Sequence, residues 1–241
     1  LDEWGAALTG IGLFTALYAV AMGVLQSNPK TVLAYSTASQ MGLVAAILGM
    51  GLAIGDREAV TAAFLNATRI SCLVGFPVGV GLLLVGEPLI LVTFEDRWRD
   101  SIPLLGILAL EMVPIFYCVF LSALYRAMNR PGWHLLIALL YAAVGLGAAI
   151  AAASFGIEVM VIGWTVRSFL LVPVHLALVR RMLGAPVGRL LSPVVAPLGG
   201  VLAMAAGLVG LRMALPPGLP PLAELAVLVP TGALVYGAAI W

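Results

Sequence analysis

The stretch Gly86–Trp133, GEPLILVTFEDRWRDSIPLLGILALEMVPIFYCVFLSALYRAMNRPGW, decides the fold of this chain. A charged loop and a basic turn enclose one apolar run, residues 102–125, which is long enough to cross a lipid bilayer as a helix. This run contains a single charged residue, Glu111. The stretch therefore predicts a membrane-spanning helix that carries one carboxylate inside the bilayer.

Similar apolar runs continue along the rest of the chain. Of its 241 residues, 63% are hydrophobic and 10% are charged, a composition that excludes an ordinary soluble domain. The predicted fold class is all-α, a polytopic integral membrane helix bundle. The runs predict about eight transmembrane helices, roughly 6–26, 31–54, 68–94, 102–125, 135–155, 158–179, 190–212 and 222–241.

Three local features modify this pattern. The third run contains Pro77 and Pro88, so we expect it to kink and to end in a short half-helix after Pro88. The preceding stretch, residues 56–69, is amphipathic and predicts a helix at the membrane surface. Residues 215–221, LPPGLPP, predict a stiff connector between the last two helices.

Composition and motifs also limit the function. The net charge of +1 is too small for a protein that binds nucleic acid. The sequence has no Gly-rich phosphate loop, no metal-ligand cluster and no nucleophile–base pair. We therefore expect no enzyme, no catalytic residue, no cofactor and no metal. A membrane-embedded acyl or glycosyl transferase would need a polar loop with paired acids or an exposed histidine, and the loops are too short for that.

Orientation follows from the basic residues, because positively charged loops are retained in the cytoplasm. We expect a multi-pass protein of a bacterial inner (cytoplasmic) membrane, and this rule predicts that both its termini are cytoplasmic. No basic leader with a cleavage site precedes the first run, and the chain starts at Leu1, so we expect a fragment without a signal peptide. The predicted cytoplasmic side collects Arg57, Arg69, Arg126, Arg130, Arg180, Arg181 and Arg189, and the other side Lys30, Arg97, Arg99 and Arg212.

A recognisable motif, SNPKTVLAYSTASQMG, follows the first run at residues 27–42 and extends into the second. It resembles the proton-translocating antiporter-like subunits of respiratory NADH dehydrogenase, membrane hydrogenases and multisubunit sodium/proton antiporters. The resemblance implies that Lys30, which precedes L-A-Y-S, lies on a proton path. The alternative is an ordinary interfacial lysine, because the chain has no second lysine and lacks that family's further titratable helices.

The rest of the chain carries a different series of motifs. Pro77 precedes GEPLI at Gly86–Ile90, Phe94 and Trp98 follow in the loop, and a basic turn closes the next helix. Their order resembles the C-terminal half of polysaccharide (lipid-linked oligosaccharide) flippases of the multidrug/oligosaccharidyl-lipid/polysaccharide superfamily. The resemblance implies alternating access without covalent chemistry. It also implies three partners: membrane lipids, an undecaprenyl-type lipid-linked glycan and a missing N-terminal half.

The two resemblances divide the chain into an antiporter-like two-helix segment, residues 1–55, and a flippase-like helix bundle, residues 56–241. They meet near residues 54–56, which predicts a fragment or a fusion. Our leading hypothesis is a flippase-like transporter of a lipid-linked polysaccharide precursor. The alternative is a proton-translocating antiporter-like subunit of a respiratory or sodium/proton antiporter complex.

Glu111 and Arg167 are the candidate site residues. Each lies about nine residues into its helix from the same face, which is a depth of about 13 Å. A buried acid and base at one depth predict a pair, for which two interpretations stay open. Arg167 could bind substrate phosphate in a bidentate manner while Glu111 positions it or exchanges a proton. Alternatively, the two residues form a static ion pair that fastens two helices together.

Overall fold

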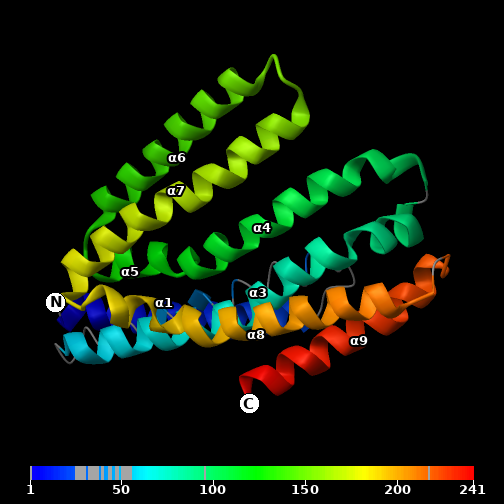
Figure 1. Ribbon diagram of the computed structural model, residues 1–241. Helices are drawn as coiled ribbons and strands as arrows, with labels where there is room; N and C mark the ends of the chain where they lie inside the picture. The colour runs from blue at the N-terminus through cyan, green and yellow to red at the C-terminus, as the bar shows by residue number, and fades with distance from the viewer. Residues whose placement is uncertain are drawn as a thin grey trace. The chain divides into compact units, whose positions relative to one another are not determined.

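The computed structural model describes residues 2–24, 56–94, 96–216 and 218–241, together with positions 31, 38, 41–42, 45–46 and 49. These residues form helices and no strand, which confirms the predicted all-α fold class (Figure 1). The helices are α1 (Asp2–Val24), α3 (Arg57–Phe94), the 3-10 helix η1 (Asp96–Ser101), α4 (Ile102–Cys118), α5 (Leu121–Ala127), α6 (Pro131–Ala152), α7 (Ile157–Leu183), α8 (Val187–Ala214) and α9 (Pro221–Ile240).

Within the described ranges, 6 helical segments are long and apolar enough to cross a membrane. They match the predicted runs from the third to the eighth. The first run coincides with α1, whose apolar part, Gly5–Ala19, is shorter. The second run, 31–54, and the candidate Lys30 lie outside the described residues apart from a few positions. The segments are Arg57–Phe94, Asp96–Arg126, Gly132–Ala152, Ile157–Leu183, Val187–Ala214 and Pro221–Ile240.

Helix α3 differs from the prediction, because it runs for 38 residues without a break and contains both Pro77 and Pro88. The expected half-helix after Pro88 is therefore wrong. A proline removes one backbone hydrogen bond, and in membrane helices the packing of neighbouring elements can compensate for that loss. The Pro88 side chain is fully buried, so such packing is present here.

The amphipathic stretch before the third run is the first part of the same helix. Its start is capped by Asp56, whose Oδ1 accepts hydrogen bonds from the backbone N–H groups of Glu58 (2.8 Å) and Ala59 (3.1 Å). An aspartate in this position satisfies donors that would otherwise lack a partner at a helix start. The sequence change at residue 56 thus coincides with a well-defined helix beginning.

The fourth predicted helix, 102–125, is divided in two. Helix α4 ends at Cys118, Val119 and Phe120 form a turn, and α5 begins at Leu121. The predicted connector LPPGLPP is confirmed by its described positions, because α8 ends at Ala214 and α9 begins at Pro221.

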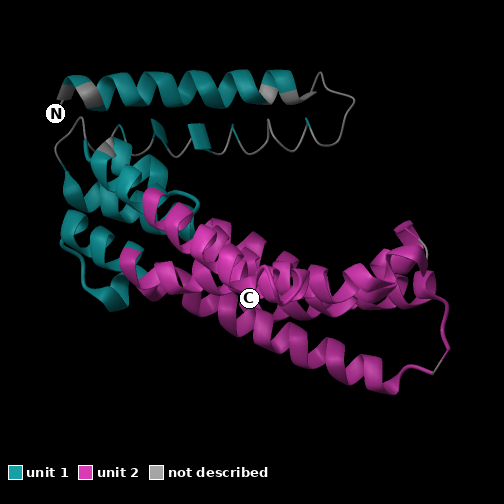
Figure 2. Ribbon diagram, turned by 90° about the horizontal axis from the view of Figure 1, so that it is seen from above, with its two compact units in different colours: residues 1–68, 118–138, 175–190 teal, residues 69–117, 139–174, 191–241 magenta. Residues whose placement is uncertain are grey.

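The chain forms two compact units (Figure 2). Unit 1 comprises residues 1–68, 118–138 and 175–190. Within it, the Thr9 hydroxyl of α1 donates a hydrogen bond to the Ala46 carbonyl (3.4 Å). A Cβ atom at Gly12 would lie only 2.5 Å from the Ala46 nitrogen, so the missing side chain permits close backbone packing.

Unit 2 comprises residues 69–117, 139–174 and 191–241 and contains the candidate site. Helices α3 and α4 approach closely in it, because a Cβ atom at Gly79 would lie 2.8 Å from the Ala109 carbonyl oxygen. Helix α9 is fastened to α3 by the Tyr236 hydroxyl, which donates a hydrogen bond to the Leu73 carbonyl (2.8 Å).

Candidate functional site

Glu111 on α4 and Arg167 on α7 meet in the interior of unit 2. Glu111 is 8% exposed and Arg167 is 7% exposed. The structure brings Arg167 Nη2 within 4.0 Å of Glu111 Oε1. This separation is too long for a direct hydrogen bond, so the two groups interact through their charges.

Ser168 is the hydrogen-bond donor to the Glu111 carboxylate. Its hydroxyl is buried and donates a hydrogen bond to Glu111 Oε1 at 2.6 Å, a length typical of a bond to a charged acceptor. The same hydroxyl lies 3.5 Å from the Trp164 carbonyl oxygen, one turn earlier in α7. A hydroxyl has a single proton, so Ser168 can serve Glu111 or Trp164 but not both at once.

The Arg167 guanidinium is held by aromatic rings. Its Cζ lies 3.8 Å from the ring centroid of Trp164 and 4.9 Å from that of Tyr141. Nη1 also donates a hydrogen bond to the Tyr141 carbonyl (3.2 Å), whereas Nε is buried without a hydrogen-bond partner among the described residues. Cation–π contacts of this kind stabilise a desolvated guanidinium by about 2 kcal/mol. Arg167 is therefore positioned largely independently of Glu111.

Gly145 on α6 makes room for this arrangement. A Cβ atom there would lie 2.5 Å from Arg167 Nη1, so any larger residue would displace the guanidinium. Glu111, Tyr141, Trp164, Arg167 and Ser168 are named the acid–base cluster below. Sequence analysis identified two of its members and missed the others, since aromatic, serine and glycine residues are common in membrane helices for packing alone.

An open apolar pocket of about 270 Å³ is lined by residues that follow cluster members along α4 and α7. It is lined by Val113 and Pro114, which follow Glu111 on α4, and by Phe169, which follows Ser168 on α7. The cluster is therefore a small polar site against apolar surroundings. Such surroundings strengthen the electrostatic interactions of any charge that remains in the site.

The other residues considered from the sequence lie elsewhere. Lys30 is outside the described residues. Arg189 forms a two-pronged ion pair with Glu58 in unit 1, one contact being Nη1 to Oε2 at 3.0 Å. Arg130 stacks over the Trp133 ring at 5.8 Å, as expected for residues at the membrane boundary. No three His, Cys, Asp or Glu side chains gather as a metal site in the described ranges.

Six helical segments within the described ranges are long and apolar enough to cross a membrane, and the matches below support a multi-pass, transporter-like membrane protein. Residues 2–73 match the family described as "NADH:quinone oxidoreductase/Mrp antiporter, TM". This match contains the Lys30 motif and continues past residue 55 into α3. It confirms the resemblance to antiporter-like subunits.

Two individual relatives support the same resemblance. A Na(+)/H(+) antiporter subunit of Alkalihalophilus pseudofirmus is 28% identical over 216 residues, covering 80% of this chain and 26% of the relative. The F(420)H(2) dehydrogenase subunit L of Methanosarcina mazei is 52% identical over 44 residues, which is 18% of this chain and 6% of the relative.

The flippase-like resemblance is supported by a shorter match. The teichuronic acid biosynthesis protein TuaB of Bacillus subtilis is 33% identical over 55 residues, or 23% of this chain and 11% of the relative. The chain thus spans about a quarter or less of the length of these relatives. No solved structure matches the chain significantly.

Proposed function

We propose that this chain is a membrane-embedded part of a proton-translocating antiporter-like subunit, in which Glu111 takes up and releases a proton. The observation that carries this proposal is the buried Glu111 carboxylate, with the Ser168 hydroxyl at 2.6 Å and the Arg167 guanidinium at 4.0 Å. The antiporter match over residues 2–73 and the relative from Alkalihalophilus pseudofirmus support it. A proton-linked transporter is thereby favoured over the flippase that the sequence motifs suggested first.

The geometry allows Glu111 to change its protonation state without rearranging the helices. Arg167 is held by Trp164, Tyr141 and the Tyr141 carbonyl, and its 4.0 Å separation from Glu111 involves no direct hydrogen bond. Protonation of Glu111 therefore breaks no bond to Arg167. An ionisable residue within a membrane segment is costly, and such residues commonly serve ion or proton pathways.

Ser168 can follow this change by rotating its hydroxyl. When Glu111 is ionised, the Ser168 proton points to Oε1. When Glu111 is protonated, its own O–H can donate to Ser168 Oγ, and the Ser168 proton can turn to the Trp164 carbonyl, 3.5 Å away. Both states thus keep the Glu111 carboxyl and the Ser168 hydroxyl hydrogen-bonded, which lowers the free-energy cost of the exchange.

The proposal extends to the partners, the second candidate residue and the location of the protein. The chain acts beside partner subunits, since two of its relatives are named as subunits. Lys30 is a second candidate for the proton path. The protein lies in a bacterial cytoplasmic membrane with both termini in the cytoplasm, and it moves its substrate without covalent catalysis.

The direct test is to observe the Glu111 proton. Infrared difference spectra of the full chain in lipid vesicles, recorded across a pH titration, should contain a carboxylic-acid band that is missing in Glu111→Gln. Glu158→Gln, which alters an exposed carboxylate at the start of α7, should keep that band. In everted vesicles, cation-dependent proton movement should be lost in the first variant and retained in the second. A Glu111 that gives no titrating band would refute the proposal.

A flippase-like function is the second candidate, favoured by the match to TuaB. In that case Arg167 would bind the pyrophosphate of an undecaprenyl-type lipid-linked glycan through donors such as its buried Nε, and Glu111 would position it. Loss of glycan export in Arg167→Gln, with the protein still present in the membrane, would support this role. If protein levels fall while export is preserved, Glu111 and Arg167 instead form a static ion pair that stabilises the packing of two helices.

A further inference from the structure

An apolar groove of about 470 Å³ runs along α3, α8 and α9 in unit 2. Its floor consists of buried side chains of the hydrophobic core, and exposed residues such as Val78 and Val229 form its edges. On α3 the groove extends from Pro77 to Leu89. The floor residues are Val85, Met204, Leu208 and Leu228.

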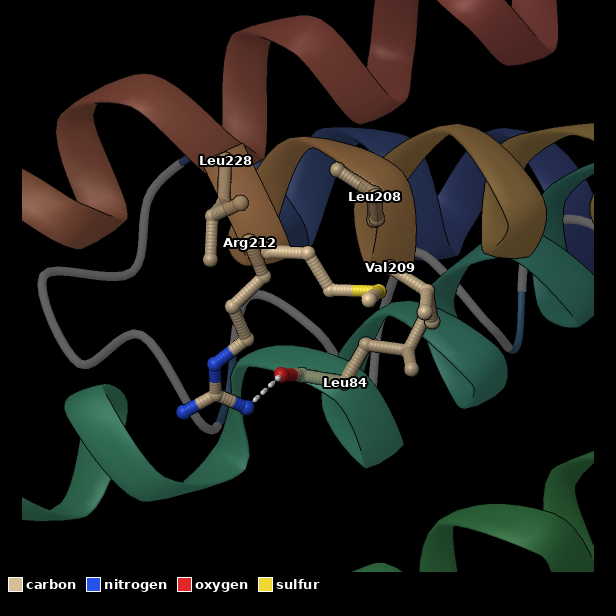
Figure 3. A pocket seen from close by; sticks show the side chains of 6 residues that line it. Leu84, Leu208, Val209, Arg212 and Leu228 are labelled. Atoms are coloured by element: carbon tan, nitrogen blue, oxygen red, sulfur yellow. Dashed lines mark hydrogen bonds between the residues drawn. The ribbon is translucent and has the colours of Figure 1, made fainter. Parts of the chain in front are cut away.

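Glu87, Arg212 and Glu224 form a group of charges that is named the Arg212 cluster, and Arg212 lines a second pocket that shares two residues with this groove. Arg212 Nε lies 2.9 Å from Glu224 Oε1, and Nη2 lies 2.9 Å from Glu87 Oε2. The Arg212 guanidinium points to the Leu84 carbonyl, at 3.4 Å (Figure 3). Leu208 and Leu228 line the same pocket as Arg212. These two leucines also line the groove, so the charged and apolar parts are continuous.

We infer that this groove and the Arg212 cluster bind one phospholipid whose headgroup carries a primary ammonium, of the phosphatidylethanolamine type. An acyl chain occupies the groove, and the headgroup contacts the cluster. This site is separate from the acid–base cluster and does not depend on the function proposed for it.

The dimensions of the groove fit a single acyl chain. Residues 77–89 of α3 extend about 18 Å, close to the ~15 Å of one leaflet of the hydrocarbon core. A volume of about 470 Å³ over that length gives a mean cross-section of about 26 Å².

The charges identify the headgroup. The cluster combines one guanidinium with two carboxylates, which gives it a net negative charge. The second oxygens of Glu87 and Glu224 can accept hydrogen bonds from an ammonium, and Arg212 has five N–H donors, enough for a phosphate as well. An anionic headgroup would be repelled, and a choline headgroup has no N–H to donate.

The cluster also lies at the level where headgroups occur. Residues 70–86 of α3 contain no charge before Glu87, and 225–240 of α9 contain none after Glu224. Arg212 lies in the last turn of α8. Arg212 and Glu224 therefore lie near the ends of their helices, where the bilayer core gives way to headgroups, and Glu87 separates the uncharged residues 70–86 of α3 from its last seven residues, 88–94.

The test is lipid binding by the purified full chain, measured by native mass spectrometry and by thermal stabilisation. The probes are phosphatidylethanolamine, phosphatidylcholine and phosphatidylglycerol with identical acyl chains. We expect phosphatidylethanolamine to bind about tenfold more tightly than the other two, or ~1.4 kcal/mol. The combined Glu87→Gln and Glu224→Gln variant should abolish this preference, and Glu158→Gln should keep it.

Groove occupancy is tested by Gly81→Leu. A Cβ atom at Gly81, a groove residue, meets nothing within 4 Å, so the leucine fills the groove without a clash. Binding of phosphatidylethanolamine should fall about tenfold. Gly147→Leu on α6, where a Cβ atom also meets nothing within 4 Å, is the matched control and should leave binding unchanged. Equal affinity for the three lipids, unaltered binding by Gly81→Leu, or capture of a second protein chain in place of lipid would overturn the inference.

Discussion

The position of the Arg167 guanidinium depends on the absence of a side chain at Gly145. Because a Cβ atom at Gly145 would lie 2.5 Å from Nη1, Gly145→Ala should push the guanidinium away from the Tyr141 carbonyl. Nη1 is the far end of a flexible side chain and can move, so we expect a cost of about 1 kcal/mol of the free energy of unfolding, the low end for small-to-large changes in packed sites. Gly147→Ala on the same helix should cost much less, since nothing lies within 4 Å of its Cβ position.

A double-mutant cycle assigns this cost to the contact with Arg167. In an Arg167→Gln background, the destabilisation caused by Gly145→Ala should shrink by about 0.5–1 kcal/mol, the low end of the range of coupling between residues in contact. The free energy of unfolding is measured in mixed detergent micelles for the parent protein, the two single variants and the double variant. Additive effects in the cycle would mean that Gly145 does not act through Arg167.

Helix rise alone could predict the meeting of Glu111 and Arg167, because each is the only charge deep within its apolar run. The sequence could not predict that Ser168 rather than Arg167 donates the hydrogen bond to Glu111. That detail depends on how α4 and α7 are rotated about their axes, which hydropathy does not encode. The ring contacts of Arg167 depend in the same way on α6.

At the level of helices, the contact between α3 and α4 depends on one of two neighbouring glycines. A Cβ atom at Gly79 would lie 2.7 Å from Met112 Cβ and 2.8 Å from the Ala109 carbonyl oxygen, whereas one at Gly81 meets nothing within 4 Å. Backbone atoms cannot move aside as a flexible side chain can. Gly79→Ala should therefore lower the free energy of unfolding by about 1–3 kcal/mol.

Gly81→Ala is the control for this prediction. It should be neutral or stabilising by up to about 1 kcal/mol, because alanine favours a helix more than glycine does. Comparing the two variants in the same micelles removes effects common to both. Equal stabilities of Gly79→Ala and Gly81→Ala would contradict the close approach of α3 and α4.

Proline positions misled the prediction for α3 and helped it for the connector. In LPPGLPP the prolines surround Gly218, which has a positive φ of 89°, and no helix continues there. Pro77 and Pro88 instead stand alone within long apolar sequence, where the remaining hydrogen bonds and the packing keep the helix intact. Several prolines close together therefore predicted the end of a helix better than a single proline did.

For the whole molecule, the number and place of the described membrane segments followed from hydropathy, and charge supplies a prediction of their orientation. The division into two units did not, because it arises from contacts between residues far apart in sequence. Orientation is directly testable by labelling with a membrane-impermeant thiol reagent. Ser154 and Gly188 lie on opposite sides of α7 along the chain, and both are exposed.

We expect Ser154→Cys to react in intact cells and Gly188→Cys only after the membrane is made permeable. The basic residues around Gly188 predict a cytoplasmic position for it by the positive-inside rule. Labelling of the unmutated protein measures the background reaction of its own cysteines, Cys72 and Cys118. Labelling of Gly188→Cys from outside would reverse the orientation.

The length of α3 makes the protein sensitive to hydrophobic mismatch. Its 38 residues extend about 57 Å, nearly twice the ~30 Å hydrocarbon core, and a tilt of about 20° accounts for little of the excess. The uncharged residues 70–86, about 26 Å long, are what a bilayer can hold. Residues 57–69 must then lie in the headgroup region or beyond it. A thicker membrane would draw charged residues towards its core, so bilayer thickness can sort this protein among membranes.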